Sequence, residues 1–256
     1  MTKKPDLQEF FLDPDLLRQP TNRKTRTSSG NGGSKAWGVY QALKRRIIVG
    51  LLTCDSAITE QSLAQEFGCS QGTVREALLT LQEDGLVERQ GYKGTFVTPC
   101  RKPEIALLLR LRYTLEVEGL TEEAVRRCTD LDLLRLRRLS DIYVAAKANR
   151  DFYACSEIDR SLHLALLSLG DLAGLAPLLN RALLITQRYV LSQVQHYPRW
   201  ASLPEDPHVE LLDALESRDA AKTRALLGEH VEQILRLTMP EEFDKPGPFH
   251  VTIGLS

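Results

Sequence analysis

The sequence lacks the features of a membrane protein and of a disulfide-stabilised secreted protein. Its 256 residues include five cysteines, an odd number, and none of them forms a CxxC pair. This pattern argues against a disulfide framework and a thiolate zinc site, and it fits a reducing compartment. No apolar run reaches the roughly 18 residues of a membrane span, and the N-terminus lacks the apolar segment of a secretory signal. We therefore expect a cytoplasmic protein without membrane contact.

Net charge is also nearly absent, at −1, but the basic residues are unevenly distributed. Residues 16–54 contain eight lysines and arginines and no acidic residue. A cationic stretch beside a folded module is suited to attract phosphate groups. A solvated linker remains an alternative for Arg18 to Lys35, because TNRKTRTSSGNGGSK has the composition of disordered chain.

A chain of this length with 43% hydrophobic residues can bury a sizeable core, and we expect two domains with separate cores. The predicted fold is mainly α, with a small domain of three helices and a β-hairpin followed by an antiparallel helical bundle. The predicted divisions are a disordered basic tail (1–35), the small domain (36–99), the bundle (103–237) and a C-terminal tail (238–256).

The small domain shows the periodicity of three short helices and a hairpin. Apolar residues recur at helical spacing from Trp37 to Val49, Thr59 and Ser70 are good N-caps for the next two helices, and Gly85 ends the third. The segments LVERQ and TFVTP then read as two strands around the turn GYKG. Two short helices followed by a hairpin predict a winged helix-turn-helix, whose second helix can enter a major groove.

The stretch ITEQSLAQEFGCSQGTVREALLTLQEDGLVERQGYKGTFVTP resembles the N-terminal domain of the GntR family of bacterial transcription regulators. Its most specific pieces are LAQEFG, VREAL, L..DGLVER and GTFV. The resemblance implies that the third helix binds double-stranded DNA and that Arg75 takes the place of the family arginine in VRE. Gln61 and Gln71 stand where relatives often carry arginine, so no operator sequence can be carried over.

The residues expected at the DNA lie in the recognition helix and on the wing. With the apolar stripe of the helix buried, Arg75 lies on its flank and should meet a phosphate or a guanine edge. Gln71 and Thr73 are the base-reading candidates, and the helix N-terminus at Ser70 favours a phosphate. The full predicted set is Ser70, Gln71, Gly72, Thr73, Arg75 and Gln61, with Gly91, Lys93 and Gly94 on the wing. The alternative is that Arg75 pairs with an acid such as Glu76 and that the module binds protein.

A second group of residues is marked by the stretch EIDRSLHLALLSLG. Asp159 and His163 stand one turn apart beside its apolar stripe, so they could bind one ligand or each other. The last two predicted helices are joined by a turn near Arg218, which lies ten residues after His208 and twelve residues before His230. In an antiparallel hairpin they therefore stand at nearly the same level. One carboxylate and three imidazoles are expected to converge inside the bundle.

Residues 103–237 resemble the all-helical FCD effector domain of the FadR subfamily, and the bundle looks closest to its six-helix, VanR-like branch. Metal-binding members carry an Asp-x-x-x-His pair and two later histidines, which map onto Asp159, His163, His208 and His230. The resemblance thus implies a divalent metal ion, zinc in the first place, with nickel, manganese or iron as alternatives.

Arg112 in LRYTLE matches a family arginine that helps to seat an anionic effector. The alternative is an ordinary i, i+4 salt bridge to Glu116. Cys155, one turn before Asp159, could border the site or be a buried structural thiol.

The two resemblances imply a DNA-binding transcription regulator that is not an enzyme. It would be a homodimeric repressor that reads a palindromic operator and responds to a small carboxylate bound near the metal. Two alternatives are a metal-dependent hydrolase, because Asp/His₃ with an open position can activate water, and a regulator whose metal is purely structural. Against the hydrolase, the sequence has no HExxH-type pairing, and a winged helix would be unexplained.

Deleting residues 1–30 is expected to leave the melting temperature almost unchanged, because no core-facing apolar stripe occurs there. The loss of Arg18, Arg23, Lys24 and Arg26 should still weaken DNA binding at low salt. Thermal unfolding and mobility shifts of the full-length and shortened proteins check both statements. A large drop in melting temperature would show that the segment packs on the body.

Overall fold

The computed structural model describes residues 32–91, 94–193 and 205–243. Lys93, the predicted tail up to residue 31 and the end of the chain from residue 244 lie outside these ranges. In chain order the elements are α3 (Gly32–Ile48), α4 (Glu60–Glu66), α5 (Gln71–Glu83), β1 (Val87–Arg89), β2 (Thr95–Val97), α6 (Lys102–Tyr113), the π-helical segment η2 (Thr114–Glu118), α7 (Glu122–Arg127), α8 (Asp130–Ala148), α9 (Phe152–Leu169), the short 3₁₀ segment η3 (Ala173–Leu175), α10 (Ala176–Gln193), α11 (Val209–Glu216), α12 (Ala220–Thr238) and α13 (Pro240–Phe243).

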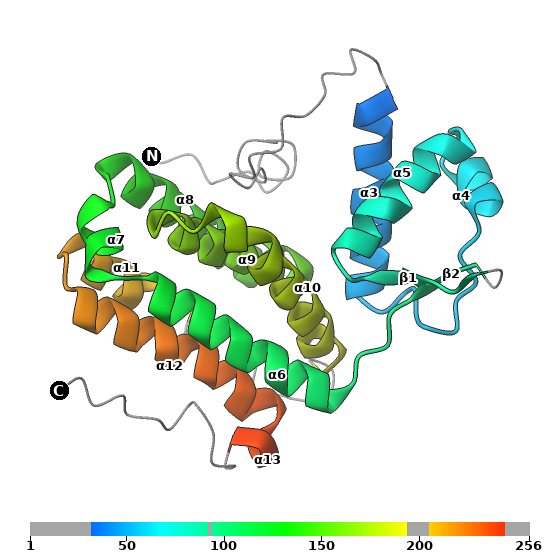
Figure 1. Cartoon of the computed structure of the whole chain (residues 1–256). Coiled ribbons are helices and arrows are strands. Elements are labelled where there is room, and N and C mark those ends of the chain that lie inside the picture. The colour runs from blue at the N-terminus through cyan, green and yellow to red at the C-terminus, as the bar shows by residue number, and fades with distance from the viewer. Residues whose placement is uncertain (1–31, 92–93, 194–204, 244–256) are drawn as a thin grey trace.

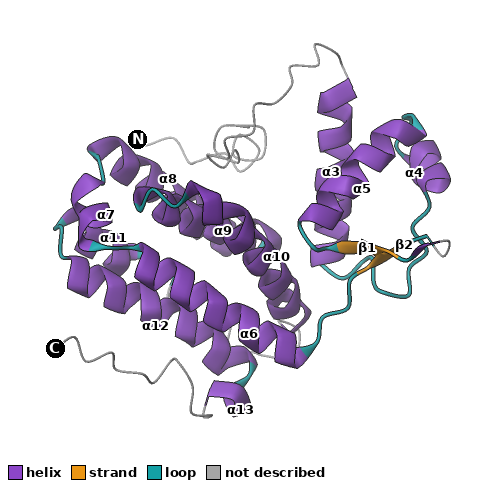
Figure 2. Ribbon diagram, viewed as in Figure 1, coloured by secondary structure: helices purple, strands orange, loops and turns teal. Residues whose placement is uncertain are grey.

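The predicted mainly α fold is confirmed (Figures 1 and 2). α3, α4, α5 and the antiparallel pair β1–β2 form the winged helix, and α6 to α12 form the helical bundle. None of the described helices is long and apolar enough to cross a membrane.

The helices of the winged helix begin at the predicted caps. The Thr59 side chain accepts the backbone N–H of Ser62, and the Ser70 side chain accepts that of Thr73. Gly85 follows α5 with a φ of +75°, a conformation that glycine adopts without strain. The local cues for these boundaries were therefore sufficient.

Both predicted tails are shorter in the structure than the sequence predicted: the C-terminal tail, expected from residue 238, contains helix α13 (Pro240–Phe243), and Met239 before it is buried. α3 begins at Gly32, so the last residues of the predicted tail are helical; Ala36 is buried and extends the apolar stripe toward the N-terminus.

α11 begins at Val209, and His208 directly precedes it. Asp206 Oδ1 accepts the backbone N–H of His208 at 2.9 Å.

The bundle contains seven α-helices, α6 to α12, in the part of the chain that the structure describes, where a six-helix branch was expected. The additional helix is α7, a segment of six residues that follows η2. Gly119 ends η2, and Thr121 caps α7 by accepting the backbone N–H of Ala124. This local restart separates α7 from the first bundle helix.

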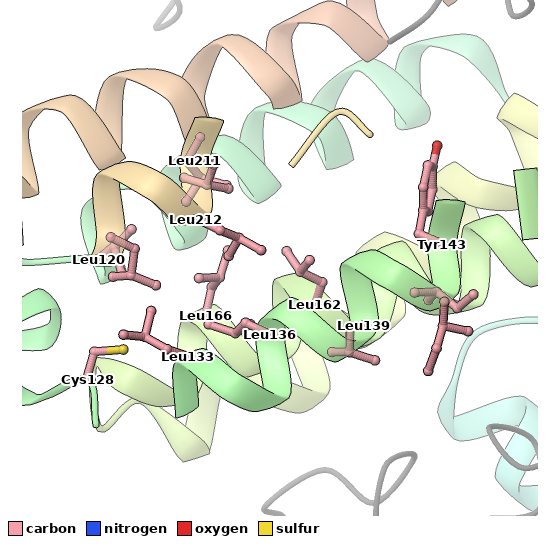
Figure 3. Packing of buried hydrophobic residues seen from close by; sticks show 14 of the residues in the cluster. Leu120, Cys128, Leu133, Leu136, Leu139, Tyr143, Leu162, Leu166, Leu211 and Leu212 are labelled. Carbon is pink, nitrogen blue, oxygen red and sulfur yellow. The ribbon is translucent and has the colours of Figure 1, made fainter. Parts of the chain in front are cut away.

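The core of the bundle is a layer of leucines contributed mainly by α8, α9 and α11 (Figure 3). Tyr143 stands at one end of this cluster with its hydroxyl pointing away from the leucines (Figure 3). Its ring meets His208 edge-on, with 5.2 Å between the ring centroids. The apolar core therefore ends where the histidines begin.

The two parts do not have separate cores, contrary to the sequence expectation. Tyr153 of α9 and Leu184 of α10 belong to the same apolar cluster as the buried residues of the winged helix. Gly85 lies so close to α10 that a Cβ there would be 2.5 Å from Arg181 Nε. The shared packing arises because α3 and the end of α5 lie directly against α9 and α10.

A buried ion-pair network crosses the same interface. Lys44 Nζ on α3 lies 2.5 Å from Glu157 Oε2 on α9, and both side chains are only 2% exposed. Arg160 Nη2, one turn further along α9, lies 2.9 Å from the same oxygen. Burial opposes the ionised form of Glu157, but Arg160 and Lys44 outweigh it and lower its pKa to about 2. Burial also lowers the pKa of Lys44, which Glu157 opposes.

The network continues to the end of the recognition helix. Arg160 Nη1 donates to Asn180 Oδ1 at 2.8 Å, and Asn180 Nδ2 donates to Asp84 Oδ1 at 2.9 Å. Tyr40 Oη of α3 donates to the other oxygen of Asp84 at 2.6 Å. Asp84 is the C-cap of α5, so polar contacts connect α9 with both α3 and α5.

Glu157→Ala should lower the free energy of unfolding by about 3–5 kcal/mol, because Lys44 and Arg160 would stay buried without their anion. Glu123→Ala is the matched control, since it removes the exposed pairs to Arg126 and Arg127 and should cost less than about 1 kcal/mol. Urea denaturation followed by circular dichroism measures both. Equal losses in the two variants would show that the network does not hold the two parts together.

Candidate metal centre and nucleic-acid surface

The structure brings the four predicted metal ligands together. Asp159 and His163 lie on α9, His208 directly precedes α11, and His230 lies on α12. Asp159 Oδ1 is 3.5 Å from His163 Nε2, 3.0 Å from His208 Nε2 and 3.4 Å from His230 Nε2. One ligand atom from each residue lies within 4.8 Å of all the others. His208 and His230 lie beside each other, as expected from the helical hairpin, with 4.9 Å between their ring centroids.

These residues fit a divalent ion. Metal–nitrogen and metal–oxygen bonds of about 2.0–2.2 Å place adjacent ligand atoms about 2.8–3.6 Å apart in octahedral or tetrahedral geometry. The three distances from Asp159 Oδ1 fall within that range. His163 Nε2 and His230 Nε2 are buried and have no hydrogen-bond partner among the described residues. Buried polar atoms of this kind normally have a partner, and a metal ion would supply one.

A buried carboxylate lies behind His163. Glu116 Oε2, on the π-helical segment η2, contacts His163 Nδ1, and Arg112 Nε donates to Glu116 Oε1 at 2.9 Å. Burial opposes the ionised form of Glu116, but Arg112 and His163 outweigh it and lower its pKa to about 2. An ionised Glu116 holds the proton of the imidazole at Nδ1, which leaves Nε2 as the ligand atom.

Asp206 stands in a similar place for His208. Its Oδ1 lies 3.5 Å from His208 Nδ1, opposite the Nε2 that faces Asp159. The contacts of Glu116 and Asp206 to the histidines were not found from the sequence. Spacing indicated only the pair Arg112–Glu116, because α6 and α9 are far apart in the chain.

The imidazoles differ in pKa. Burial lowers the pKa of His230 to about 4, because its contact to Asp159 does not compensate. For His163 burial acts in the same direction, but Glu116 and Asp159 outweigh it and raise the pKa to about 9. The Asp159 side chain is 18% exposed; partial burial raises the pKa of its carboxyl, but the histidines outweigh this and hold the pKa well below the usual value. The centre thus combines an ionised Asp159 with a protonated His163 and a neutral His230, and a metal bound at His163 Nε2 would displace the proton from that nitrogen.

A cavity of about 100 Å³ adjoins the four-residue centre, between α6, α8, α9, α10 and α12. Asp159 and His230 line one part of it. Arg112 lines it as well, and its buried Nη2 has no hydrogen-bond partner among the described residues. Arg112 therefore forms the predicted salt bridge to Glu116 through Nε and borders the cavity. Cys155 is both buried and part of the cavity wall.

The predicted DNA-contacting residues of the recognition helix lie at its N-terminal end. Ser70, Gln71 and Gly72 are exposed, and Thr73 is half-buried because its hydroxyl lies against the Ser70 cap. Gln61 is exposed on α4. On the wing, Gly91 and Gly94 have positive φ values of +51° and +103°, as the tight turn requires.

Arg75 pairs with an acid, as the alternative interpretation allowed, but the acid is Glu60 rather than Glu76. Its Nε and Nη2 bind Glu60 Oε1 and Oε2 at 3.0 and 2.6 Å, while Arg89 Nη2 lies 3.9 Å from Oε1. Glu76 is adjacent to Arg75 on the same helix and cannot face it, whereas Glu60 begins the neighbouring helix α4. The Arg75 side chain is 55% exposed, so a phosphate can still reach it.

Comparison with known families and proteins agrees with this architecture. Residues 35–97 match the family described as "Bacterial regulatory proteins, gntR family", and residues 107–233 match the "FCD domain". The uncharacterized HTH-type transcriptional regulator BphR of Paraburkholderia xenovorans (strain LB400) is 29% identical over 200 residues, which cover 75% of this chain and 80% of BphR. The HTH-type transcriptional repressor RspR of Escherichia coli (strain K12) is 22% identical over 202 residues, 77% of this chain and 85% of RspR.

Solved structures of similar chains have the same fold. Escherichia coli McbR/YncC superposes with a TM-score of 0.65 at 21% identity, over 81% of this chain and 98% of the other. A putative transcriptional regulator GntR from Rhodococcus sp. RHA1 gives 0.61 at 24% identity, over 79% and 98% of the two chains.

The two family matches cover most of the chain, and the relatives are named as regulators rather than enzymes. The hydrolase alternative is therefore dropped. The chain belongs to the GntR family and is a transcriptional regulator that combines a winged helix-turn-helix with an FCD domain.

Proposed function

We propose that this regulator is a homodimeric repressor whose bundle binds a divalent metal ion and, beside it, a small carboxylate effector. The observation that carries the proposal is the convergence of three imidazole Nε2 atoms on the Asp159 carboxylate. Zinc is the first candidate, with nickel, manganese or iron as alternatives, because all four accept imidazole and carboxylate ligands. Two recognition helices of a dimer would read a palindromic operator.

Arg112 is the proposed anchor of the effector. A bound ion would supply positive charge at one part of the cavity, and Arg112 adds its guanidinium, whose Nε binds Glu116 while its Nη2 has no hydrogen-bond partner among the described residues. A carboxylate is the anion whose geometry matches a guanidinium, and its oxygens can also ligate a divalent ion. The positive charge of the ion and of the guanidinium favours an anionic ligand over a neutral one.

Helix α9 offers a route from the effector to the DNA. Asp159 and His163 face the proposed metal, while Glu157 and Arg160 of the same helix bind Lys44 of the winged helix and Asn180. A helix moves as a rigid body over a few turns, so a shift at the metal would be transmitted to α3. We propose that effector binding changes DNA affinity through this helix.

Metal removal should destabilise the protein, because an ion held by Asp159, His163, His208 and His230 joins three segments of the bundle. A chelator is expected to lower the melting temperature, and added Zn²⁺ or Ni²⁺ should restore it. His208→Ala should abolish the restoration. Glu116→Gln keeps every ligand and should weaken metal binding about 10- to 100-fold.

Elemental analysis of untagged protein, with thermal unfolding of the same samples, measures these effects. Near-zero metal in wild type and His208→Ala, together with no effect of chelator, would contradict the metal centre. Stoichiometric metal with no response of DNA binding to any organic acid would favour a purely structural ion.

Arg75→Ala should weaken operator binding strongly and reduce its dependence on salt, because one phosphate contact and its released counterion are lost. Arg126→Ala is the control, since Arg126 is an exposed arginine of the bundle. Gln71→Ala should instead change the preferred base at one position of each half-site, by about 1–3 kcal/mol. Mobility shifts on selected operator DNA over a salt series test this assignment. Equal affinity of Arg75→Ala and wild type would refute it.

A further inference from the structure

Glu60 lies where three elements that carry predicted DNA contacts meet. It is the first residue of α4, and Ile58 before it pairs with Thr95 of β2 in an isolated antiparallel bridge. Thr95 is also the partner of Arg89 in the register of β1 and β2. These pairings bring the start of α4 to the base of the wing, while α5 packs against α4. One carboxylate therefore lies between the recognition helix and the wing.

Glu60 binds Arg75 along one edge of the guanidinium. Nε and Nη2 of Arg75 donate to the two carboxylate oxygens at 3.0 and 2.6 Å. A guanidinium has five N–H groups, and this side-on contact uses two of them. The two N–H groups of Nη1 and the second N–H of Nη2 form the end-on edge, which matches two acceptors of a phosphate or of a guanine. Glu60 thus leaves one binding edge of Arg75 outside the contact and fixes its direction.

The same carboxylate offsets the positive charge at this surface. Arg75 is the only basic residue of α5. Arg89, at the end of β1, is a second cation near Glu60, with its Nη2 3.9 Å from Oε1. Both arginine side chains are more than half exposed, whereas that of Glu60 is 21% exposed. Arg75 holds the pKa of Glu60 below its usual value, so the carboxylate is ionised at neutral pH. The recognition helix therefore approaches DNA with its one cation already paired.

We propose that Glu60 is a specificity-determining residue. It holds the end-on edge of Arg75 in the direction that the operator requires, and its negative charge weakens the attraction of Arg75 and Arg89 for the phosphates of all other DNA. This assignment rests on the proposed function, which places Arg75 at the operator. Glu60 acts through the two arginines and is a positioning residue.

Charge and orientation act differently on the two kinds of complex. The negative charge of Glu60 opposes DNA phosphates in every complex, because this repulsion does not depend on base sequence. A fixed guanidinium edge contributes only where a phosphate or a base edge stands at the matching position, as in the complex with the operator. Without Glu60, Arg75 would have to lose rotamer freedom to make that contact. Loss of Glu60 therefore favours non-specific DNA more than it favours the operator.

Glu60→Gln tests the proposal, because glutamine removes the charge and offers one acceptor atom in place of two. The affinity for non-specific DNA should rise about three- to tenfold at low salt, and the dependence of log K on log salt should steepen by about one unit, as for one additional phosphate contact. The ratio of operator affinity to non-specific affinity should fall about tenfold. Fluorescence anisotropy over a salt series measures these values, with a duplex selected from a random-sequence library and a scrambled duplex of the same composition.

Glu66→Gln is the matched control. Glu66 is the last residue of the same helix and binds Arg46, so the exchange removes an equal charge without affecting Arg75. It should leave the affinity ratio unchanged. Glu60→Asp separates orientation from charge, because it keeps the charge on a side chain that is one methylene shorter. In this variant the ratio should fall while the non-specific affinity stays at the wild-type value. In the Arg75→Ala background, Glu60→Gln should leave the ratio unchanged.

Three results would overturn the inference: an unchanged ratio in Glu60→Gln, a non-specific affinity that does not rise in that variant, or an equal fall of the ratio in Glu66→Gln. The melting temperatures should stay close to that of wild type, because surface ion pairs contribute little to stability. If Glu60→Gln does not fold, the ratio in Glu60→Asp decides.

The single variant Arg75→Ala separates this failure from that of the proposed function. If it binds the selected operator as tightly as wild type, the assignment of the recognition helix fails, and the role of Glu60 fails with it. If Arg75→Ala binds the operator weakly and the ratio in Glu60→Gln is nevertheless unchanged, only the role of Glu60 is overturned.

Discussion

Helix α9 is constrained on two faces by buried charges, and the arrangement of the molecule depends on it. Glu157 and Asp159 are two residues apart, which at about 100° per residue places them on opposite sides of the helix. Glu157 binds Lys44 of the winged helix, and Asp159 binds three histidines of the bundle. Neither carboxylate can lose its partners without leaving a buried charge, so the rotation and position of α9 are set from both sides.

The interface between the two parts is polar at its centre although it is buried. Apolar residues in place of Lys44 and Glu157 could give similar stability, because an ion pair gains little over a well-packed apolar contact. The ion pair adds directionality, because Glu157 accepts hydrogen bonds only from the positions that Lys44 and Arg160 occupy. A polar contact of this kind defines one orientation of the winged helix relative to α9. It also makes that orientation sensitive to a displacement of the helix, which is what a regulator needs.

The proposed centre and the cavity share one side chain network. Glu116 contacts His163 with one oxygen and Arg112 with the other, so the same carboxylate orients a candidate metal ligand and a candidate effector anchor. The π-helical turn at Glu116 gives the backbone a local irregularity at this point, as is common near functional sites. Family membership establishes the regulator, but the fold alone does not name a ligand.

Local sequence patterns were enough to determine the caps at Thr59 and Ser70, the hairpin, the mainly α fold and the family, because these depend on residues close together in the chain. Helical spacing placed Asp159 beside His163, and the length of a helical hairpin placed His208 level with His230, whereas the resemblance to the FCD domain identified the four as one set of metal ligands. Only the tertiary structure decided that Arg75 pairs with Glu60, that Glu116 contacts His163, and that the winged helix shares its core with Tyr153 and Leu184. The physical reason is that contacts between distant helices depend on their packing angles and rotations, which no periodicity in a single helix specifies.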